Sequence, residues 1–338
     1  MPRAVSRTSI PGRPAEIVVI TVTAPQDRRR PQPRGPVVVV TANVHGDECT
    51  GTGAVIRLAQ ALEPLLLRGT VHLYPSLNPE AFERRQRRVP EDEQDLNRLF
   101  PGDPEGSPSE RLAAAAWGDI ASRRPDALVD LHADAPGAIP YALVDRAVAL
   151  RGEARANLES LAESYAVATG LTVVREYPDD RYSRFRLDRS LTGAVLNRLR
   201  VPAVTVEAGP RLVLEEHAVD TATRAVAGVL HSMGLVAEPA SRHASHVSGG
   251  PWRRESGPRA STSGVLVPRV TPGHFARRGT VVAEVRSLAG ALLEELSAET
   301  DGFVLSPAER AHVVAGVPAC TWVTAERGTA ERGAGERP

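Results

Sequence analysis

The chain has 338 residues, of which 42% are hydrophobic and 24% are charged, and its 41 basic residues balance its 41 acidic ones. This composition is that of a globular protein, and the zero net charge argues against nucleic acid or an anionic membrane as the main partner. Every basic residue is an arginine, because the sequence contains no lysine, which excludes Schiff-base lysines, P-loop lysines and Ser–Lys dyads.

Six hydrophobic segments alternate with amphipathic segments over residues 16–235, and several are continuous runs of Val, Leu or Ile. Such runs are typical of strands covered on both faces. The predicted strands are 16–24, 36–44, 70–77, 126–133, 171–177 and 202–209, and the predicted helices are 51–62, 107–122, 153–170 and 214–234. The alternation predicts an α/β domain over residues 1–236, with a mixed, largely parallel sheet flanked by helices.

The composition changes after this domain. Residues 237–262 are rich in Ser, Gly, Pro, Arg and His and have no periodicity, which predicts a linker or a surface loop. Residues 263–326 contain short β-type runs separated by glycines and prolines, which predict a small all-β domain, a barrel or a sandwich. The tail, residues 327–338, has the composition of a disordered segment.

The chain carries no signal for export or membrane insertion. The two cysteines, Cys49 and Cys320, are far apart and indicate no disulfide framework. No apolar run approaches the ~20 residues that span a bilayer, and the N-terminus has no apolar region of a secretory signal. We therefore expect a cytoplasmic protein.

Two predicted strands end in residues that bind zinc well. His45 and Glu48 follow the strand 36–44, and His132 ends the strand 126–133. Imidazole nitrogens and carboxylate oxygens are zinc ligands, and a catalytic zinc takes three protein ligands and keeps one position open. In open α/β sheets, ligands collect at the carboxyl ends of the strands. Asp130 is placed to orient the ring of His132.

Glu207 ends a third predicted strand, 202–209. Burying a carboxylate there costs folding free energy, so we expect it either to serve a function or to be paired. Next to an activated water it would act as a general base and pass the proton to a leaving amine. The alternative is an ordinary carboxylate paired with one of the many arginines.

The charged segment 78–102 supplies groups that can bind substrate. Asn97 and Arg98 place an amide beside a planar guanidinium, which suits a substrate carboxylate. Arg87 or Arg88 would polarise the scissile carbonyl and stabilise its oxyanion.

These residues belong to motifs that resemble a known family. HGDE (45–48), NPEAF (78–82), DLNRLFPG (95–102), DLH (130–132) and TVEAG (205–209) occur in this order. The set is similar to the succinylglutamate desuccinylase/aspartoacylase family of zinc-carboxypeptidase-like (M14-type) hydrolases, and is closest to its N-acyl-diaminobutyrate deacetylase-like branch. The stretches 270–285 and 293–305 resemble the family's C-terminal biotinyl/lipoyl-like β-domain, although no lysine is present here to be modified.

The resemblance implies a fold, a cofactor and roles for individual residues. It implies a zinc-carboxypeptidase-like fold and one Zn²⁺ per chain, held by His45, Glu48 and His132, with Glu207 as base and proton shuttle. It implies hydrolysis of an N-acyl amino acid or a related small N-acyl compound. Asn97 and Arg98 would bind the substrate carboxylate. Arg87 best fits the oxyanion arginine, while Arg85 and Arg88 lie close enough in the sequence to remain alternatives.

The sequence departs from that branch in a more charged segment, RRVPEDEQ (87–94), and in an arginine-rich insert, residues 179–190. The insert is either a lid, from which Tyr182, Arg184 or Arg186 reaches the substrate, or an ordinary solvated loop.

Other functions fit parts of the same residue set. A zinc carboxypeptidase for short peptides would use Asn97 and Arg98 to hold a C-terminal carboxylate, and an inactive homologue would keep the fold to bind small molecules. A His₂Glu set also resembles a ferrous-iron triad, but the neighbouring Asn–Arg pair favours hydrolysis. The expected partner is a small-molecule N-acyl substrate, with a homo-oligomer also expected. His243 and His246 are assigned to the linker and not to a second metal site.

Overall fold

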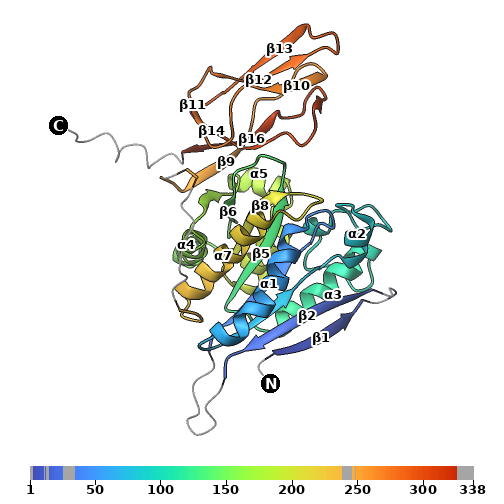
Figure 1. The fold of residues 1–338 in the computed structure, drawn as a ribbon, viewed down its shortest axis with the longest axis vertical. Coiled ribbons are helices and arrows are strands. Elements are labelled where there is room, and N and C mark those ends of the chain that lie inside the picture. The colour runs from blue at the N-terminus through green and yellow to red at the C-terminus, as the bar shows by residue number, and fades with distance from the viewer. Residues whose placement is uncertain are drawn as a thin grey trace, which may run out of the picture.

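The computed structural model describes residues 3–10, 12, 15–25, 35–237, 246–247 and 249–325. The predicted disordered tail, 327–338, and His243 lie outside these residues. Figure 1 shows a helix-flanked lower part that carries the N-terminus and a β-rich upper part formed by the C-terminal residues.

The largest element of the fold is a 12-stranded sheet with the strand order β1-β2-β4-β3-β5-β8-β6-β7-β9-β16-β14-β11. Its first eight strands in that order are β1 (Arg3–Ser9), β2 (Glu16–Thr23), β4 (Thr70–Tyr74), β3 (Val37–Ala42), β5 (Ala127–Asp134), β8 (Ala203–Pro210), β6 (Tyr141–Val144) and β7 (Thr172–Arg175). β4, β3, β5 and β8 run parallel to one another, β2 and β6 are antiparallel to their neighbours β4 and β8, and β7 is parallel to β6. The mixed, largely parallel sheet predicted from the sequence is confirmed.

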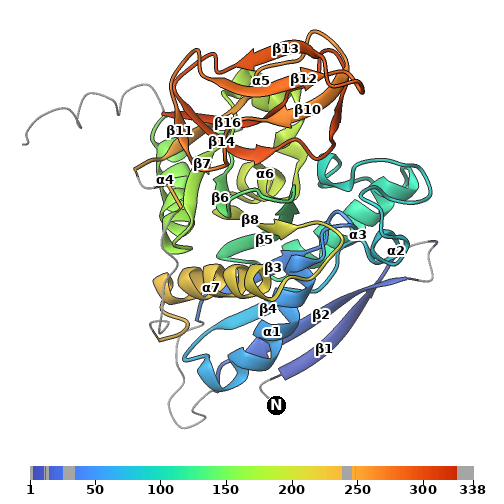
Figure 2. The same ribbon diagram turned by 45° about the horizontal axis from the view of Figure 1, so that its top comes forward.

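Helices cover both faces of this sheet (Figure 2), and alternate residues of a strand point to opposite faces. The long helices are α1 (Thr50–Leu65), α3 (Pro108–Ser122), α4 (Gly152–Ala168) and α7 (Glu216–Ser232), and the short ones are α2 (Pro79–Arg84), α5 (Asp179–Arg184) and α6 (Leu191–Ala194). Apolar side chains of α1, α4 and α7 pack on Val38 and Val40 of β3 and on Val129 of β5. Those of α3 and α6 pack on Val39 and Leu128 on the other face.

All the predicted strands and long helices are present, with ends shifted by a few residues. Before residue 236, two strands escaped prediction. β1 is an edge strand with mostly exposed, polar side chains and therefore shows no buried face in its sequence. β6 is only four residues long, too short for a periodic pattern to be visible.

Part of the predicted linker is a strand, and this corrects the prediction for 237–262. β9 (Trp252–Ser256) pairs with β7 on one side and with β16 (Cys320–Ala325) on the other. Three consecutive charged residues form its centre, so it has no apolar alternation, and two of them, Arg254 and Glu255, form ion pairs with Glu176 and Arg181. Consequently the large sheet runs without a break from the N-terminal part into the C-terminal part.

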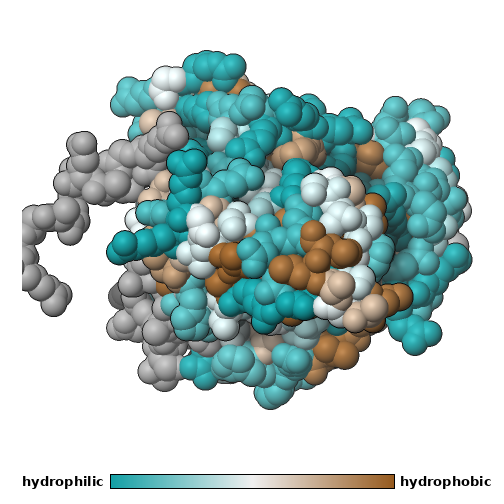
Figure 3. Space-filling view, turned by 90° about the horizontal axis from the view of Figure 1, so that it is seen from above, coloured by the Kyte–Doolittle hydropathy of each residue, from teal (hydrophilic) through white to brown (hydrophobic). Residues whose placement is uncertain are grey.

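The C-terminal region is all-β, as predicted. β14 (Gly302–Pro307) and β11 (Phe275–Ala276) complete the large sheet, and a second antiparallel sheet has the order β13-β12-β10-β15. Its strands are β13 (Leu292–Ser297), β12 (Val281–Arg286), β10 (Gly264–Pro268) and β15 (His312–Val313). Seen from above, this end of the molecule is mostly hydrophilic with patches of hydrophobic side chains (Figure 3). Among the described residues, no helix has both the length and the hydrophobicity to cross a membrane.

The strand register determines where polar side chains meet. In β5, Leu128 packs on the α3 side of the sheet, so Asp130 and His132 point to that side as well. In β8, Ala203 faces the same side, and so do Thr205 and Glu207. Polar residues at the carboxyl ends of adjacent parallel strands therefore converge on one face of the sheet.

Two helix glycines give a test of this packing. A Cβ added at Gly228 of α7 would lie 2.1 Å from the carbonyl oxygen of Ala168, whereas one at Gly118 of α3 would meet nothing within 4 Å. We expect Gly228→Ala to lower the free energy of unfolding by roughly 1–3 kcal/mol, because α7 must shift from α4. Gly118→Ala should raise it by about 0.5–1 kcal/mol through helix propensity. Urea denaturation measures both, and equal effects would contradict the close α4–α7 contact.

Candidate metal and substrate site

The loop after β3 is held in a shape that brings His45 and Glu48 together. Asn43 adopts a left-handed conformation with φ of 57°, and its side-chain amide donates hydrogen bonds to the backbone carbonyls of His45 (2.9 Å) and Glu48 (3.1 Å). A Cβ at Gly46 would lie 2.2 Å from the backbone of Ala81, so this position requires glycine. The packing of this loop against Ala81 thus explains why a glycine follows His45 in the HGDE motif.

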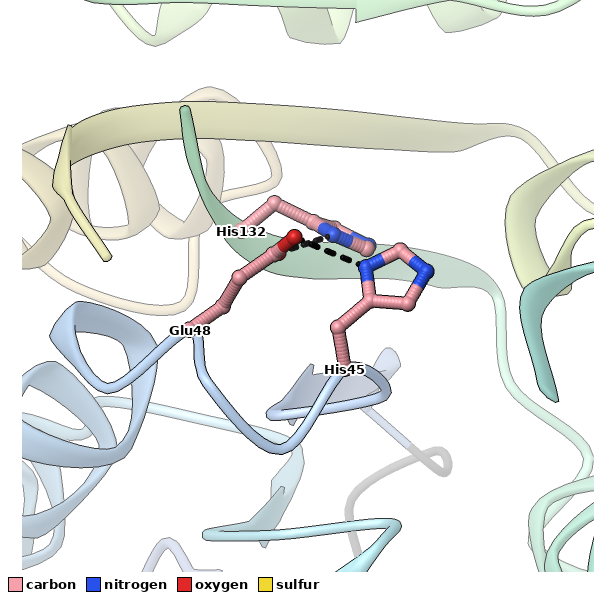
Figure 4. Close-up of side chains that lie close together, drawn as sticks. All are labelled: His45, Glu48 and His132. Atoms are coloured by element: carbon pink, nitrogen blue, oxygen red, sulfur yellow. Dashed lines mark hydrogen bonds and ion pairs between the residues drawn. The ribbon is translucent and has the colours of Figure 1, made fainter. Parts of the chain in front are cut away.

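The Glu48 carboxylate lies between two imidazole rings (Figure 4). Its Oε1 is 2.8 Å from Nδ1 of His45, and its Oε2 is 2.7 Å from Nδ1 of His132. The ring centroids are 5.2 Å apart, and all three side chains are at least 95% buried. The structure therefore brings together the three residues that the sequence proposes as metal ligands.

A carboxylate contacts the outer nitrogen of each ring. Nε2 of His45 is 3.1 Å from Asp95, and Nε2 of His132 is 2.9 Å from Asp130, which also accepts a 2.7 Å hydrogen bond from Thr41. Carboxylates in these positions fix the orientation of a metal-binding imidazole and raise its basicity. Both Nδ1 atoms are left facing Glu48, on the side where a metal ion would bind.

The charges of this cluster depend on one another. Burial alone raises the pKa of Glu48, but the adjacent His45 and His132 outweigh it and hold that pKa well below its usual value. Burial lowers the pKa of His132, but Asp130 and Glu48 reverse this and raise it well above its usual value. One donor atom from each of His45, Glu48 and His132 can be chosen so that all lie within 4.8 Å of one another, which is a spacing that a single cation can bridge.

Glu207 lies beside this cluster because of the strand register. It is paired with His132 of β5 on one side and with Tyr141 of β6 on the other. Burial raises its pKa to about 8, with Asp134 and Glu48 adding to the effect and His132 opposing it. A cation held by the three ligands would act in the same direction as His132 and favour the ionised carboxylate.

The cluster opens into a cavity of about 210 Å³ on the α3 side of the sheet. Arg87, Asn97 and Arg98 line it, as the sequence predicts for substrate contact. Arg87 donates a 2.6 Å hydrogen bond to Glu48. Asn97 accepts one from the backbone of Leu191 at 2.8 Å, which leaves its NH₂ group for a ligand, and Arg98 uses one nitrogen on the carbonyl of Asn97.

Three of the predicted substrate-binding residues do not line this cavity, and we correct their assignment. Arg88 is exposed and donates to the carbonyl of Glu93, and Arg186 is exposed in a left-handed turn. Tyr182 is fully buried and donates a hydrogen bond to Asp145, so it contacts a residue of the cavity wall without lining the cavity itself. Arg85, the other candidate for the oxyanion, is exposed at the end of α2. The spacing of charges along the chain did not reveal which way each side chain points.

The cavity also contains residues that sequence reasoning missed. Arg211 lines it and directly follows the strand that carries Glu207. Asp95 does not line the cavity but contacts His45, and it lies within the DLNR motif. Both therefore had a signal in their position next to a motif. Arg211 is 3.6 Å from Glu48 and forms a 2.7 Å ion pair with Glu309 of the C-terminal β-domain. Asp145, Glu176 and Glu309 line the cavity because of the tertiary fold, and no motif beside them in the sequence predicts that position.

Comparisons with known proteins identify the family and the fold. Residues 34–233 match the family model of the succinylglutamate desuccinylase/aspartoacylase catalytic domain. A solved succinylglutamate desuccinylase/aspartoacylase from Rhodobacter sphaeroides is 23% identical, covers 96% of both chains and has a TM-score of 0.77. A metallo-carboxypeptidase from Burkholderia cenocepacia is 18% identical, covers 69% of this chain and 65% of its own, and has a TM-score of 0.50.

A curated relative matches a shorter part of the chain. The N-alpha-acetyl-L-2,4-diaminobutyric acid deacetylase of Halomonas elongata is 36% identical over 98 residues. The match spans 29% of this chain and 28% of that protein.

The ligand cluster predicts the metal content of variants. We expect the purified protein to bind one Zn²⁺ per chain, and His132→Ala to bind less than a tenth as much, because the cluster would keep only two ligands. His274→Ala removes an exposed histidine of the β-domain and serves as the control. Elemental analysis after dialysis measures both. Affinity should fall as the pH decreases, since the raised pKa of His132 makes protons stronger competitors for its ring.

Proposed function

The chain belongs to the succinylglutamate desuccinylase/aspartoacylase family, and from this premise we propose that it hydrolyses the amide bond of a small N-acyl compound. The proposal assigns one zinc ion per chain to His45, Glu48 and His132. The observation that carries it is the convergence of these three buried ligands beside Glu207, in a cavity lined by arginines.

The donor set fits zinc. Two imidazole nitrogens and one carboxylate are the ligands of catalytic zinc sites that keep an open position. Asp95 and Asp130 provide the outer hydrogen bonds that such histidines require. When bound, zinc acts as a Lewis acid and lowers the pKa of a coordinated water to about 7.

Glu207 is proposed as the general base. Its carboxylate lines the cavity next to His132, and a carboxylate in this position accepts a proton from the attacking water. The same group then donates that proton to the nitrogen of the scissile amide, so that the amine leaves as a neutral molecule. Desolvation raises the pKa of Glu207, which favours the protonated form that this second step needs.

Arg87 is proposed to stabilise the oxyanion. One of its nitrogens donates to Glu48, and the rest of its guanidinium lines the cavity. Arginine N–H groups aimed at a carbonyl oxygen stabilise the negative charge that develops when water attacks. Asn97 and Arg98 are proposed to bind the carboxylate of the amine half, since an amide NH₂ and a guanidinium there remain available.

A deacylase of small compounds fits the cavity better than a carboxypeptidase of peptides. Glu309 of the β-domain reaches the cavity and pairs with Arg211 from the strand β8 side. Both residues line a cavity of about 210 Å³, a volume that suits a small compound better than a long peptide. The relative from Halomonas elongata deacetylates N-alpha-acetyl-L-2,4-diaminobutyric acid, which makes N-acetylated diamino acids the first substrates to test.

The base assignment predicts the effect of Glu207→Gln. The amide keeps the size of the side chain but cannot accept the proton, so we expect turnover of an N-acetyl amino acid to fall by on the order of 100–10,000-fold. Zinc should stay bound, because Glu207 is not a ligand. The measurement is amine release over a panel of N-acyl amino acids and short peptides, with metal content determined in parallel. Near-normal turnover would overturn the assignment, and release from peptides alone would favour a carboxypeptidase.

The arginine assignments are tested by two neighbouring residues. Arg87→Ala should lower kcat by about 100–1000-fold, the usual effect of losing one oxyanion donor, while zinc remains bound. Arg88→Ala is the matched control, because that side chain is exposed and outside the cavity, and its kcat should be close to that of the wild type. If both substitutions had the same effect, Arg87 would not be the oxyanion donor.

A further inference from the structure

The C-terminal β-domain has an apolar groove that adjoins the cavity of the metal ligands. This β-domain groove has a volume of about 420 Å³ and lies between the end of β14, the start of β16 and the segment that joins them, residues 308–319. Three residues, Asp134, Glu309 and Thr321, line both the groove and the cavity of the metal ligands. The groove therefore begins where that cavity ends, and β14 and β16 are on the side of the β-domain that faces the catalytic part (Figures 1 and 2).

A second opening continues from the groove into the β-domain. This inter-sheet cavity has a volume of about 330 Å³ and lies between the two sheets, with Leu266 of β10, Val282 of β12 and Val304 of β14 in its wall. Ala308 and Cys320 line both the β-domain groove and this cavity. Adjoining openings thus lead from the metal ligands to the interior of the β-domain.

Short side chains create the inter-sheet cavity. Ala283, Ala319 and Cys320 line it at positions that belong to the hydrophobic core of the β-domain, where longer aliphatic side chains would fill the space. Burial raises the pKa of the Cys320 thiol to about 12, which agrees with apolar surroundings. A cavity in an apolar core lowers stability, and water gains little there because apolar walls offer it no hydrogen bonds. An apolar ligand removes this disadvantage by filling the cavity.

The wall of the β-domain groove is apolar as well. Val314 and Val317 line it and are 53% and 47% exposed, and Val313 and Pro318 lie in the same wall. Exposed apolar side chains along a groove with polar residues at one end are typical of a ligand-binding site. The ligand that fits this shape has a polar group at the metal ligands and an apolar chain in the groove.

The proposed binding of the amine half leaves this direction to the acyl half of the substrate. On one side of the metal ligands, Asp95 contacts Nε2 of His45 and accepts a 2.9 Å hydrogen bond from the backbone N–H of Asn97. On the other side, Arg211 lies 3.6 Å from the ligand carboxylate and 2.7 Å from Glu309. A substrate whose amine half lies at Asn97 and whose amide lies at the metal ligands therefore extends its acyl half toward Glu309 and the groove.

The two carboxylates at the start of the groove already have partners. Asp134 accepts hydrogen bonds from the hydroxyl of Tyr141 (2.9 Å) and from the backbone N–H of Ala135 (2.7 Å). Glu309 is paired with Arg211. An apolar chain can pass both carboxylates while these contacts stay intact, so its passage leaves no buried charge without a partner.

We propose that the β-domain groove and the inter-sheet cavity bind the apolar chain of an N-acyl substrate, so that the enzyme prefers long aliphatic acyl groups to acetyl. The inference rests on the proposed deacylase function and adds the chemical class of the acyl half. Hydrolysis then adds water across the amide bond and releases a fatty acid and an amine. The chain would contact apolar side chains only, so each added methylene gains affinity by leaving water.

A series of acyl chain lengths tests this proposal on the zinc-loaded wild type. The substrates are the N-acetyl, N-butanoyl, N-hexanoyl, N-octanoyl and N-decanoyl derivatives of one amino acid, and the measurement is amine release. We expect kcat/KM to rise by roughly two- to fourfold for each methylene until the inter-sheet cavity is filled. Values that stay level or fall beyond the acetyl compound would overturn the proposal without any variant being needed.

Ala308→Phe tests the route of the chain, because Ala308 lines both openings at the point where they join. The added ring should block the inter-sheet cavity and bring kcat/KM for the N-decanoyl substrate to within about tenfold of the N-acetyl value, which itself should change little. Ala315→Phe is the matched control, since Ala315 is exposed and lines neither opening. A merely structural effect would lower all substrates together, and an unchanged preference for long chains in Ala308→Phe would contradict this route.

A binding measurement separates this proposal from the function on which it rests. Calorimetry of decanoate and acetate with the purified protein requires no turnover. Decanoate that binds to the wild type and to Ala315→Phe, but much more weakly to Ala308→Phe, would support the chain site even if no amide were hydrolysed, in which case only the deacylase function would fail. Hydrolysis that is independent of chain length would leave the function standing and remove the acyl site, and decanoate bound in that case would identify a separate fatty-acid site.

Discussion

The site depends on one buried carboxylate, Glu48, that the sheet holds between two imidazoles. A carboxylate with 2% exposure is strongly unfavourable unless positive charge lies against it. Arg87 supplies a guanidinium at 2.6 Å, His45 contacts the carboxylate from the same loop, and His132 contacts it from the next strand of the sheet. The parallel register of β3 and β5 brings the two histidines to the same side, so the fold and the site are specified by the same strand pairing.

The sequence revealed the parts of the site that local patterns encode. His45, Glu48, His132 and Glu207 each follow a hydrophobic strand, and the carboxyl ends of adjacent strands meet at one edge. Arg88 and Arg186 show where this reasoning stops. They belong to arginine-rich loops, and the direction of a loop side chain depends on backbone turns, such as the left-handed Arg186, that composition does not encode.

The prediction of the fold from the sequence had the same limit as the prediction of the site. Long hydrophobic runs gave the central strands and the helices that cover them, because burial on both faces leaves a strong pattern. β9 left no such pattern, since charged side chains pair across it with Glu176 and Arg181. It is also the strand that joins the two parts of the sheet. Glu309 could be placed beside Arg211 only once that continuity was known, because nothing in the local sequence links the two.

The cavity is lined by charges of both signs, which bear on the proposed metal ion and on the proposed substrate. Six carboxylates, Glu48, Asp134, Asp145, Glu176, Glu207 and Glu309, face four guanidinium groups, Arg87, Arg98, Arg211 and Arg254. Among the side chains that line the cavity, carboxylates outnumber guanidinium groups by two, and a divalent cation on Glu48 and the two histidines would offset this difference. Arg98 lies next to Asn97, whereas Asp145 is hydrogen-bonded by hydroxyl groups. This distribution of charge fits the small N-acyl compound that we propose as substrate, with its carboxylate bound by Arg98 and Asn97.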